Sequence, residues 1–323
     1  MDLLALLADG QFHSGEELGE RLGISRAAIS KQLAHWREQG LELDVVHGKG
    51  YRLRQPLEWL SQGQVLQGMA DAARALVADL RIEQRINSTN DVILQQLREQ
   101  PRSGLICLAE QQTAGRGRRG RSWASPLACN FYGSISWTFD DGFAVVEGLS
   151  LAVGVAVAQA LERAGAVGIQ LKWPNDLMVG ERKLGGILLE MQGEASGPCH
   201  LVVGIGVNFH LSPEVAAGID KPVIDLKTVL GGPVARNLVT SLILEEVLLL
   251  LRDYARLGFA AWQERWMRRD VSQGQPVSIV GLAQAIDGIA RGVDEHGALL
   301  VETAGGLERI HGGEVSLRAG QSV

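Results

Sequence analysis

Residues 115–123 read GRGRRGRSW, and the seven positions from Gly115 to Arg121 hold three glycines and four arginines. The last acidic residue before them is Glu110, and the next after them is Asp140. Four permanent positive charges so close together cannot be neutralised within a core. Glycines let backbone amides approach a ligand, and guanidinium groups pair with carboxylate or phosphate. The stretch predicts an anion-binding loop, while a flexible loop in solvent is the alternative that these residues alone leave open.

The same letters contain the pattern G-x-G-x-x-G, which must be tested as a dinucleotide-binding fingerprint. That fingerprint requires a strand directly before it and a helix that opens on its last glycine. A strand over 105–109 fits, but five residues separate it from the loop, and Ser122–Pro126 then lead into a strand-like run over 130–139. Neither a kinase glycine loop nor a G-x-x-x-x-G-K-[ST] motif is present. A dinucleotide oxidoreductase is therefore set aside.

The composition is that of an ordinary globular protein long enough for two or three domains. The 323 residues are 46% hydrophobic and 21% charged, with a net charge of −6, so any contact with DNA must come from a local patch. The cysteines (Cys107, Cys129, Cys199) are odd in number without paired spacing, which favours a reducing cytoplasm. The start of the chain lacks a basic signal region, and the most apolar run, 143–164, contains Glu147 and Glu162. We expect a cytoplasmic protein without a membrane span.

Residues 1–55 predict a winged helix-turn-helix. Leucines recur at helical spacing over 2–8, a second short helix covers 16–22, and Gly23-Ile24 forms a turn. Ser25 then caps a third helix over 26–38, whose inward positions are Ala28, Ile29, Leu33 and Trp36. Two short strands around 47–50 follow as a hairpin in the position of a wing.

Charge supports a DNA-binding role for this domain. Residues 1–20 hold five acids and no lysine or arginine, whereas residues 21–54 hold seven such bases against three acids. The candidate DNA contacts lie at the start of the third helix, on its outer face and in the wing: Ser25, Arg26, Ser30, Lys31 and Lys49. The alternative is a helical interaction domain with a mixed surface.

The central region begins after a linker over 55–64 that contains Pro56. We expect a helix over 64–80, a strand over 81–86, and a helix that carries Val92, Ile93, Leu94 and Leu97 after the run Asn87–Asn90. In this run Ser88 or Thr89 is most simply an N-cap, although the free amides of a helix start also bind polar ligand groups.

Two later motifs place polar or glycine residues inside apolar strands. In KWPND (172–176), Pro174 interrupts regular pairing and leaves Lys172, Asn175 and Asp176 accessible, although a plain turn explains these letters equally well. Lys183 opens a strand with Gly185 and Gly186, and a second strand ends in GIGVN (204–208). A lone lysine at a strand start is usually a surface residue, but glycines across two strands predict the wall of a flat pocket.

The last third predicts two helices, 236–251 and 253–269, followed by a small β-barrel. Short apolar runs over 276–280, 285–293, 298–303 and 307–311 are separated by glycines, as in small all-β domains.

Taken in order, the motifs GRGRRGRSW, KWPND, KLGGILLE (183–190) and GIGVN resemble those of biotin–protein ligases. The winged helix-turn-helix ahead of them is similar to that of the bifunctional bacterial members, which also repress the biotin operon. One motif alone is a weak signal, whereas four in this order are specific, and the resemblance covers nearly the whole chain.

The resemblance implies an α+β protein of three domains: a winged helix-turn-helix over 1–60, a mixed-sheet ligase domain of the biotin/lipoate type over 65–270, and an SH3-like barrel over 271–323. It implies that biotin and ATP give biotinyl-5′-AMP, and that biotin then passes to a lysine of the biotin carboxyl carrier protein of acetyl-CoA carboxylase. Mg²⁺ would arrive with ATP rather than in a metal site of the protein. Operator DNA is a further partner, and biotinyl-5′-AMP would act as corepressor and favour a homodimer.

The resemblance also assigns roles to residues. Lys183, Arg118 and Asp176 are the catalytic candidates, with Lys183 against the biotin carboxylate and the α-phosphate, and Asp176 a partner for Mg²⁺ or the incoming lysine. Trp123 would stack on adenine. The expected biotin pocket comprises Ser88, Thr89, Asn90, Gln112, Gly115, Arg116, Gly117, Arg118, Lys183, Gly186 and Gly204. The expected ATP and adenylate contacts are Arg118, Arg121, Trp123, Lys172, Asn175, Asp176 and Asn208.

Two alternatives belong to other classes. A repressor that senses a ligand without ligase activity would not need the phosphate grip offered by Arg116, Arg118 and Lys183. A lipoate ligase would share the central fold and the acyl-adenylate chemistry, but GRGRRG, KWPND and the DNA-binding domain favour biotin.

Overall fold

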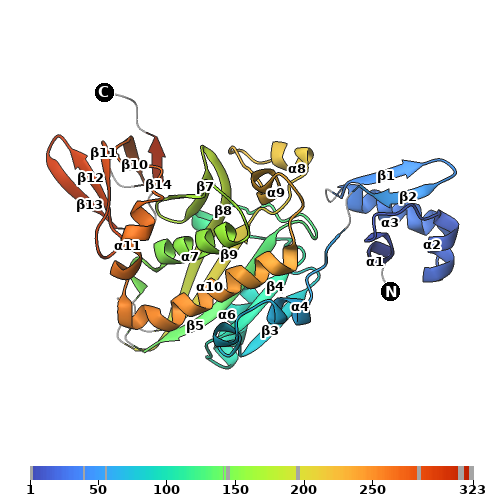
Figure 1. Ribbon diagram of the computed structural model, residues 1–323, viewed down its shortest axis with the longest axis horizontal. Helices are drawn as coiled ribbons and strands as arrows, with labels where there is room; N and C mark the ends of the chain where they lie inside the picture. Colours follow the sequence, from blue (N-terminus) through green and yellow to red (C-terminus); the bar gives the residue numbers. More distant parts are fainter. Residues whose placement is uncertain are drawn as a thin grey trace.

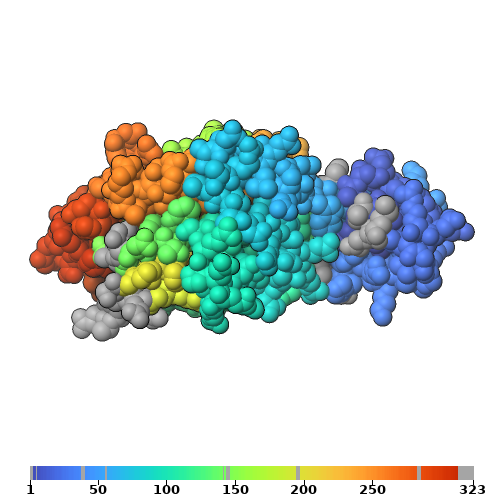
Figure 2. Space-filling model, turned by 90° about the horizontal axis from the view of Figure 1, so that it is seen from below, coloured from blue at the N-terminus to red at the C-terminus, as the bar shows by residue number. Residues whose placement is uncertain are grey.

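The computed structural model contains three separate β-sheets, one in each part of the chain. The structure describes residues 3–38, 41–54, 57–140, 142, 146–193, 197–281, 285–311 and 316–319. A two-stranded hairpin belongs to the N-terminal domain, a seven-stranded sheet to the centre and a five-stranded sheet to the C-terminal part. The N-terminal domain and the C-terminal sheet lie at opposite ends of an elongated molecule (Figures 1 and 2).

The N-terminal domain has the expected helices and wing. Its elements are α1 (Leu3–Leu7), α2 (Gly15–Leu22), α3 (Arg26–Glu38), β1 (Leu43–Val46) and β2 (Gly50–Leu53). Gly23 ends α2 in the left-handed conformation, with φ of 66°. The Ser25 hydroxyl accepts a hydrogen bond from the Ala28 amide (3.2 Å), so the cap was correctly predicted. Ile29 and Leu33 point into a small core of the domain's own leucines.

The central sheet has the strand order β3-β4-β5-β9-β8-β7-β6. Its strands are β3 (Asp79–Glu83), β4 (Leu105–Ala109), β5 (Phe131–Phe139), β6 (Gln170–Lys172), β7 (Asp176–Val179), β8 (Arg182–Gly193) and β9 (Cys199–Val207). The β3–β4 pair is parallel and the other neighbouring pairs are antiparallel. This is the mixed sheet that was expected.

Helices cover both faces of the central sheet. On one face, α7 (Leu149–Arg163) and α10 (Arg236–Leu257) lie side by side (Figure 1). On the other, α6 (Thr89–Glu99) packs Ile93 and Leu97 against Cys107 and Val202 of the sheet. The remaining helices are α4 (Gln62–Gln67), α5 (Asp71–Arg74), α8 (Pro213–Ala217), α9 (Leu226–Leu230) and α11 (Ala260–Met267). In the described ranges, every helix is too short or too polar to cross a bilayer.

Several expected boundaries are wrong. The helix expected over 64–80 is two short helices, α4 and α5, and Gly68 ends the first of them. Gly68 packs closely on α10, since a Cβ there would lie 2.5 Å from the Ser241 hydroxyl. The strand expected over 81–86 occupies 79–83 instead. The long helix over 143–164 begins at Leu149 after Gly148, whose φ is 67°; residues 143–145 of that expectation lie outside the described residues. The break between the last two helices falls at Gly258, not near residue 252.

The C-terminal sheet is antiparallel in the order β13-β12-β11-β10-β14. Its strands are β10 (Pro276–Val280), β11 (Ile286–Val293), β12 (Leu299–Thr303), β13 (Gly306–Ile310) and β14 (Ser316–Ala319); the last was not expected. Its buried residues belong to the same hydrophobic core as the central sheet, whereas the N-terminal domain has a core of its own. The Trp173 indole donates to the Gly297 carbonyl (3.2 Å), so the C-terminal part supports the KWPND turn.

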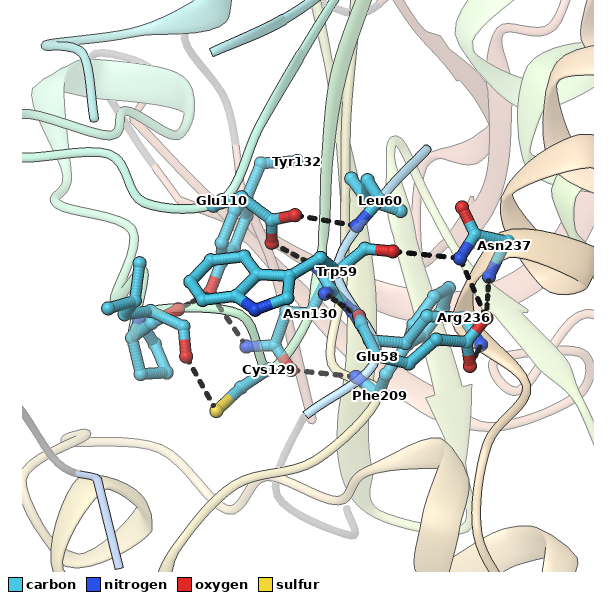
Figure 3. A network of polar contacts seen from close by, with 12 residues as sticks. Glu58, Trp59, Leu60, Glu110, Cys129, Asn130, Tyr132, Phe209, Arg236 and Asn237 are labelled. Carbon is cyan, nitrogen blue, oxygen red and sulfur yellow. Dashed lines mark hydrogen bonds and ion pairs between the residues drawn. The ribbon is translucent and has the colours of Figure 1, made fainter. Parts of the chain in front are cut away.

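A buried polar network joins the linker to the central domain (Figure 3). The Glu58 carboxylate accepts hydrogen bonds from the backbone amides of Arg236 (2.7 Å) and Asn237 (3.0 Å), and so caps α10. The Arg236 guanidinium donates to the Glu110 carboxylate (2.9 Å), which also accepts from the Leu60 amide (2.7 Å). The linker is therefore docked on the strand end that leads into the glycine–arginine loop.

Candidate functional site

A cavity of about 960 Å³ opens beside β8 and β9, where the strand glycines were expected to form a wall. Its lining contains Gly186 and Gly204 of these strands, residues of the glycine–arginine loop, and the segment 218–223. The other expected pocket residues in the lining are Ser88, Thr89, Asn90, Gln112, Arg116, Gly117, Arg118, Arg121, Trp123, Lys172, Asn175, Asp176, Lys183 and Asn208. Gly115 lies behind the wall, where a Cβ would come within 3.0 Å of the Gln112 amide and closer still to the Ser125 hydroxyl.

The glycine–arginine loop is a tight hairpin at the cavity. The Gly117 amide donates to the Arg121 carbonyl (2.7 Å), and the Trp123 amide donates to the Gly115 carbonyl (2.8 Å). At its tip Arg119 has a φ of 60°, a conformation that non-glycine residues adopt only when the surrounding turn demands it. The hairpin brings Arg118, Arg121 and Trp123 to the same cavity.

Hydroxyl and amide side chains form one end of the cavity. Gln112 Oε1 accepts from the Thr89 amide (2.9 Å) and from its hydroxyl (3.2 Å). The Ser134 hydroxyl lies 2.6 Å from Thr89 Oγ1 and 2.5 Å from Asn90 Oδ1. Ser88 is the N-cap residue of α6, as expected, but its side chain makes no capping hydrogen bond. This end offers donors and acceptors of the kind that a polar ring can use.

Lys183 lines the cavity and is partly buried. Its ammonium group donates to the Asp176 carboxylate (2.5 Å) and lies 5.5 Å from the centre of the Trp123 ring. Lys183 and Asp176 are each 22% exposed. An ammonium held between a carboxylate and an aromatic face is well placed to meet an incoming anion.

The strand glycines allow side chains to lie flat on the sheet. A Cβ at Gly204 would come 2.3 Å from Asn90 Oδ1, and a Cβ at Gly206 would come 2.6 Å from the Trp123 indole. A Cβ at Gly186 would lie 3.2 Å from Lys183 Nζ. The glycines were expected to admit a ligand, and the structure shows that they also admit three of the expected pocket side chains.

Two expected nucleotide contacts also hold the backbone in place. The side-chain amide of Asn175 donates to the Ile187 carbonyl (2.6 Å), which ties the KWPND turn to β8. The side-chain amide of Asn208 donates to the Ile224 carbonyl (3.2 Å), which ties β9 to the chain after segment 218–223. Both residues line the cavity, and their contacts shape its walls.

The cavity is strongly basic. Its lining holds the bases Arg116, Arg118, Arg119, Arg121, Lys172, Lys183 and Lys221, and the acids Asp176, Glu181 and Asp220. Burial lowers the pKa of the Arg118 guanidinium, although Asp176 acts against this. Burial, followed by repulsion from Arg121, lowers the pKa of Lys221. This cavity therefore suits a ligand that carries several negative charges.

Sequence reasoning missed Lys221 in the lining and three residues that contact lining residues from behind it: Ser134, Asp91 and Glu190. Ser134 carries a signal, because a hydroxyl inside a largely buried strand requires polar partners. Lys221 lies in a segment without a motif. Asp91 and Glu190 both pair with Arg116. Asp91 reads in the sequence as an ordinary charged position, and Glu190 ends the KLGGILLE motif but was given no role there. The described residues contain no cluster of histidine, cysteine or acidic side chains that could hold a metal ion.

The five candidate DNA contacts share one property, because Ser25, Arg26, Ser30, Lys31 and Lys49 are all exposed. The first four lie at the start of α3 or on its open face, and Lys49 lies in the turn of the β1–β2 wing. Helix and wing thus present bases and hydroxyls to solvent, as a DNA-binding surface requires.

Three family models match the chain in the order of its domains. The biotin/lipoate A/B protein ligase family matches residues 82–208, the biotin protein ligase C-terminal domain matches 273–318, and an HTH domain matches 1–52. The fold and the site are thus those of a protein ligase of the biotin/lipoate class joined to a DNA-binding domain.

Full-length relatives narrow this class. The chain is 39% identical over 321 residues to the bifunctional ligase/repressor BirA of Escherichia coli, covering 99% of this chain and 98% of that protein. It is 29% identical to BirA of Bacillus subtilis, covering 98% of each. Among solved structures, the biotin protein ligase from Aquifex aeolicus in complex with biotin and ATP matches with a TM-score of 0.65 and 28% identity, covering 75% of this chain and 99% of that one. The chain belongs to the family of bifunctional biotin ligase/repressors.

Proposed function

We propose that this chain ligates biotin to a carrier-protein lysine through biotinyl-5′-AMP, and that it represses transcription with the same adenylate as corepressor. The observation that carries the proposal is the basic cavity in which Lys183, Asp176 and Trp123 meet the glycine–arginine loop. The similar Aquifex aeolicus ligase binds biotin and ATP, which supports these two substrates.

In the first step a carboxylate oxygen of biotin attacks the α-phosphorus of ATP. The new O–P bond forms while the bond to the β-phosphate oxygen breaks, and pyrophosphate leaves. Two anions must approach each other, so cations that face both supply most of the help. Lys183 would lie against the carboxylate and the α-phosphate, with Arg118, Arg121 and Lys172 toward the phosphates. Mg²⁺ would accompany the triphosphate and supply further charge neutralisation there.

In the second step the amine of the carrier lysine attacks the activated carbonyl. A C–N bond forms, the C–O bond to AMP breaks, and the amine gives up a proton, for which Asp176 is the candidate acceptor. No side chain has to become covalently attached, so catalysis rests on positioning and electrostatics. The expected biotin contacts at Ser88–Asn90, Gln112 and Gly204, and the expected stacking of adenine on Trp123, belong to the same proposal.

The regulatory part of the proposal rests on the exposed face of α3 and on the wing. The chain would bind an operator as a homodimer that biotinyl-5′-AMP favours, since two-fold symmetric sites call for paired recognition helices. The proposed partners are thus operator DNA and the biotin carboxyl carrier protein, and the proposed location is the cytoplasm. The domain limits 1–60, 65–270 and 271–323 are part of this proposal.

The test is incubation with ATP, Mg²⁺ and a carrier domain, with labelled biotin in one tube and labelled lipoate in another. Label on the carrier lysine from biotin alone supports the ligase. Transfer of lipoate would replace it with the lipoate ligase alternative. Tight binding of biotin without adenylate or transfer would favour a ligand-sensing repressor.

A further inference from the structure

Arg116 lines the cavity, but the two carboxylates that pair with its guanidinium do not. Its guanidinium donates to both oxygens of Asp91 on α6, at 2.9 and 2.6 Å. The same guanidinium lies 3.5 Å from the carboxylate of Glu190 in β8. That carboxylate also accepts a hydrogen bond from the side-chain amide of Asn90 (2.5 Å). A bidentate pair of this kind fixes geometry as well as charge.

This pair joins the glycine–arginine hairpin to the body of the domain. Within the hairpin, the backbone bonds of Gly117 and Trp123 connect loop residues to each other. Arg116, by contrast, connects the loop to a helix that begins about 25 residues earlier in the chain. Asp91 and Glu190 are not among the residues that line the cavity. Asp91 therefore acts on the loop, whereas Glu190 contacts both the loop and the side chain of Asn90.

The pairing changes the role expected for Arg116. Both oxygens of Asp91 are engaged, and this pairing raises the pKa of the Arg116 guanidinium. Asp176, the partner of Lys183, lines the cavity, whereas Asp91 does not, so the pair with Asp91 holds the Arg116 guanidinium at α6. The Arg118 guanidinium is more buried than that of Arg116, and it is attracted by the Asp176 carboxylate. Arg118 is thus the better contact for a ligand anion.

We propose that Arg116 and Asp91 form a latch that holds the glycine–arginine loop over the cavity, with Glu190 as an auxiliary acceptor. Arg116 is then a positioning residue and not a contact for the biotin carboxylate. The latch as such stands on the ion pair. Its consequence, slower escape of the adenylate, rests on the proposed function.

The test in the ligand-free full-length protein is limited trypsin digestion, with cleavage after Arg118, Arg119 and Arg121 followed by mass spectrometry. Asp91→Asn removes the charge and keeps the size, whereas Asp91→Glu keeps the charge. Asp79→Asn is the matched control, because Asp79 forms a similarly exposed pair with Arg81 (2.9 Å) away from the loop. Half-exposed pairs contribute up to about 1 kcal/mol, which corresponds to about a fivefold change in loop opening.

We expect Asp91→Asn to speed cleavage in the loop about fivefold, and Asp91→Glu and Asp79→Asn to leave it near the wild-type rate. Added salt should narrow the difference between wild type and Asp91→Asn, because an exposed pair is screened. Loop cleavage of Asp91→Asn at the rate of Asp79→Asn would overturn the latch, and so would cleavage of Asp91→Glu as fast as that of Asp91→Asn.

A second measurement follows the release of biotinyl-5′-AMP from the loaded enzyme, where Asp91→Asn should release it about fivefold faster. Equal release from wild type and variant would overturn the role of the latch in retention. A chain that makes no adenylate would refute the ligase, while the digestion would still decide on the latch itself.

Discussion

The guanidinium of Arg236 lies 2.9 Å from the carboxylate of Glu110, and the two side chains are only 6% and 3% exposed. Around this pair the linker backbone at Glu58 and Leu60, the start of α10 and the Asn130 carbonyl all make hydrogen bonds (Figure 3). Glu110 is followed two residues later by Gln112, which bonds Thr89 at the cavity. The short stretch from Glu110 to Gln112 therefore contacts the linker at one end and the cavity at the other.

Replacing Arg236 by Met should strongly destabilise the central domain. The substitution leaves Glu110 buried without its cation, which typically costs about 3–5 kcal/mol. The double variant Glu110→Gln with Arg236→Met should lose less than the sum of the two single variants, because no uncompensated charge remains. Urea unfolding of all four proteins measures this. Additive losses would contradict a coupled pair.

Alanine at Gly204 and at Gly206 should separate the two substrates. The new Cβ of Gly204→Ala would press on Asn90 and that of Gly206→Ala on Trp123. Overpacking of about 1–3 kcal/mol corresponds to roughly 5- to 150-fold weaker binding, of biotin in the first variant and of ATP in the second. Gly232→Ala is the control, since its Cβ meets nothing within 4 Å. Calorimetric titration with each ligand checks this, and equal losses for both ligands in both variants would refute the assignment.

Much of the fold could be predicted from local sequence. The uniformly apolar run 105–109 is β4 at its expected limits, and the cap at Ser25 marks the start of α3 correctly. The elements that were wrongly predicted involve contacts with residues that are distant in the sequence. Gly68, which ends α4, packs against Ser241, 173 positions away, and this contact leaves no room for a side chain. β14 pairs with its neighbour β10, although three other strands lie between them in the sequence.

The site divides in the same way. Glycine, arginine and Lys-Trp-Pro-Asn-Asp motifs mark positions that line the cavity, because their chemistry is unusual for a loop or a strand. Asp91 and Lys221 carry no such mark, since isolated charges in a helix or a loop are common. Only the folding of α6 and of segment 218–223 against the glycine–arginine loop gives them a place at the site.

The stability of the domain should depend on pH through Asp270, which lies where β6 meets the entrance to the C-terminal sheet. Burial raises the pKa of Asp270 from 3.8 to about 6, and its Oδ2 is buried with no hydrogen-bond partner among the described residues. Since the folded chain holds this proton more tightly than the unfolded chain, the free energy of unfolding falls as the pH rises from about 4 through 6.

A shift of this size corresponds to about 3 kcal/mol at most. Wild type should therefore lose up to about 3 kcal/mol of unfolding free energy between pH 4 and pH 7 relative to Asp270→Asn, which does not titrate. Urea unfolding across this range isolates the contribution, because the other groups are common to both proteins. Parallel pH curves for the two proteins would show that Asp270 is not the source.

DNA binding should become less dependent on salt when basic side chains of α3 are removed. Each phosphate contact contributes about one unit to the slope of log affinity against log salt. Arg26→Ala and Lys31→Ala should each weaken binding and lower this slope by about one. Arg291→Ala, in the C-terminal sheet, should leave both unchanged. Fluorescence anisotropy with duplexes selected from a random pool provides the measurement, and unchanged slopes in both helix variants would exclude α3 as the contact surface.

The most direct test of the central claim is to look for the adenylate itself. The full-length chain would be incubated with ATP, Mg²⁺ and labelled biotin without any carrier, and pyrophosphate and bound biotinyl-5′-AMP would be quantified. We predict that wild type forms adenylate that stays bound, and that Lys183→Gln still binds biotin but forms it about 100- to 1000-fold more slowly. Wild type that binds biotin and releases no pyrophosphate would contradict the account.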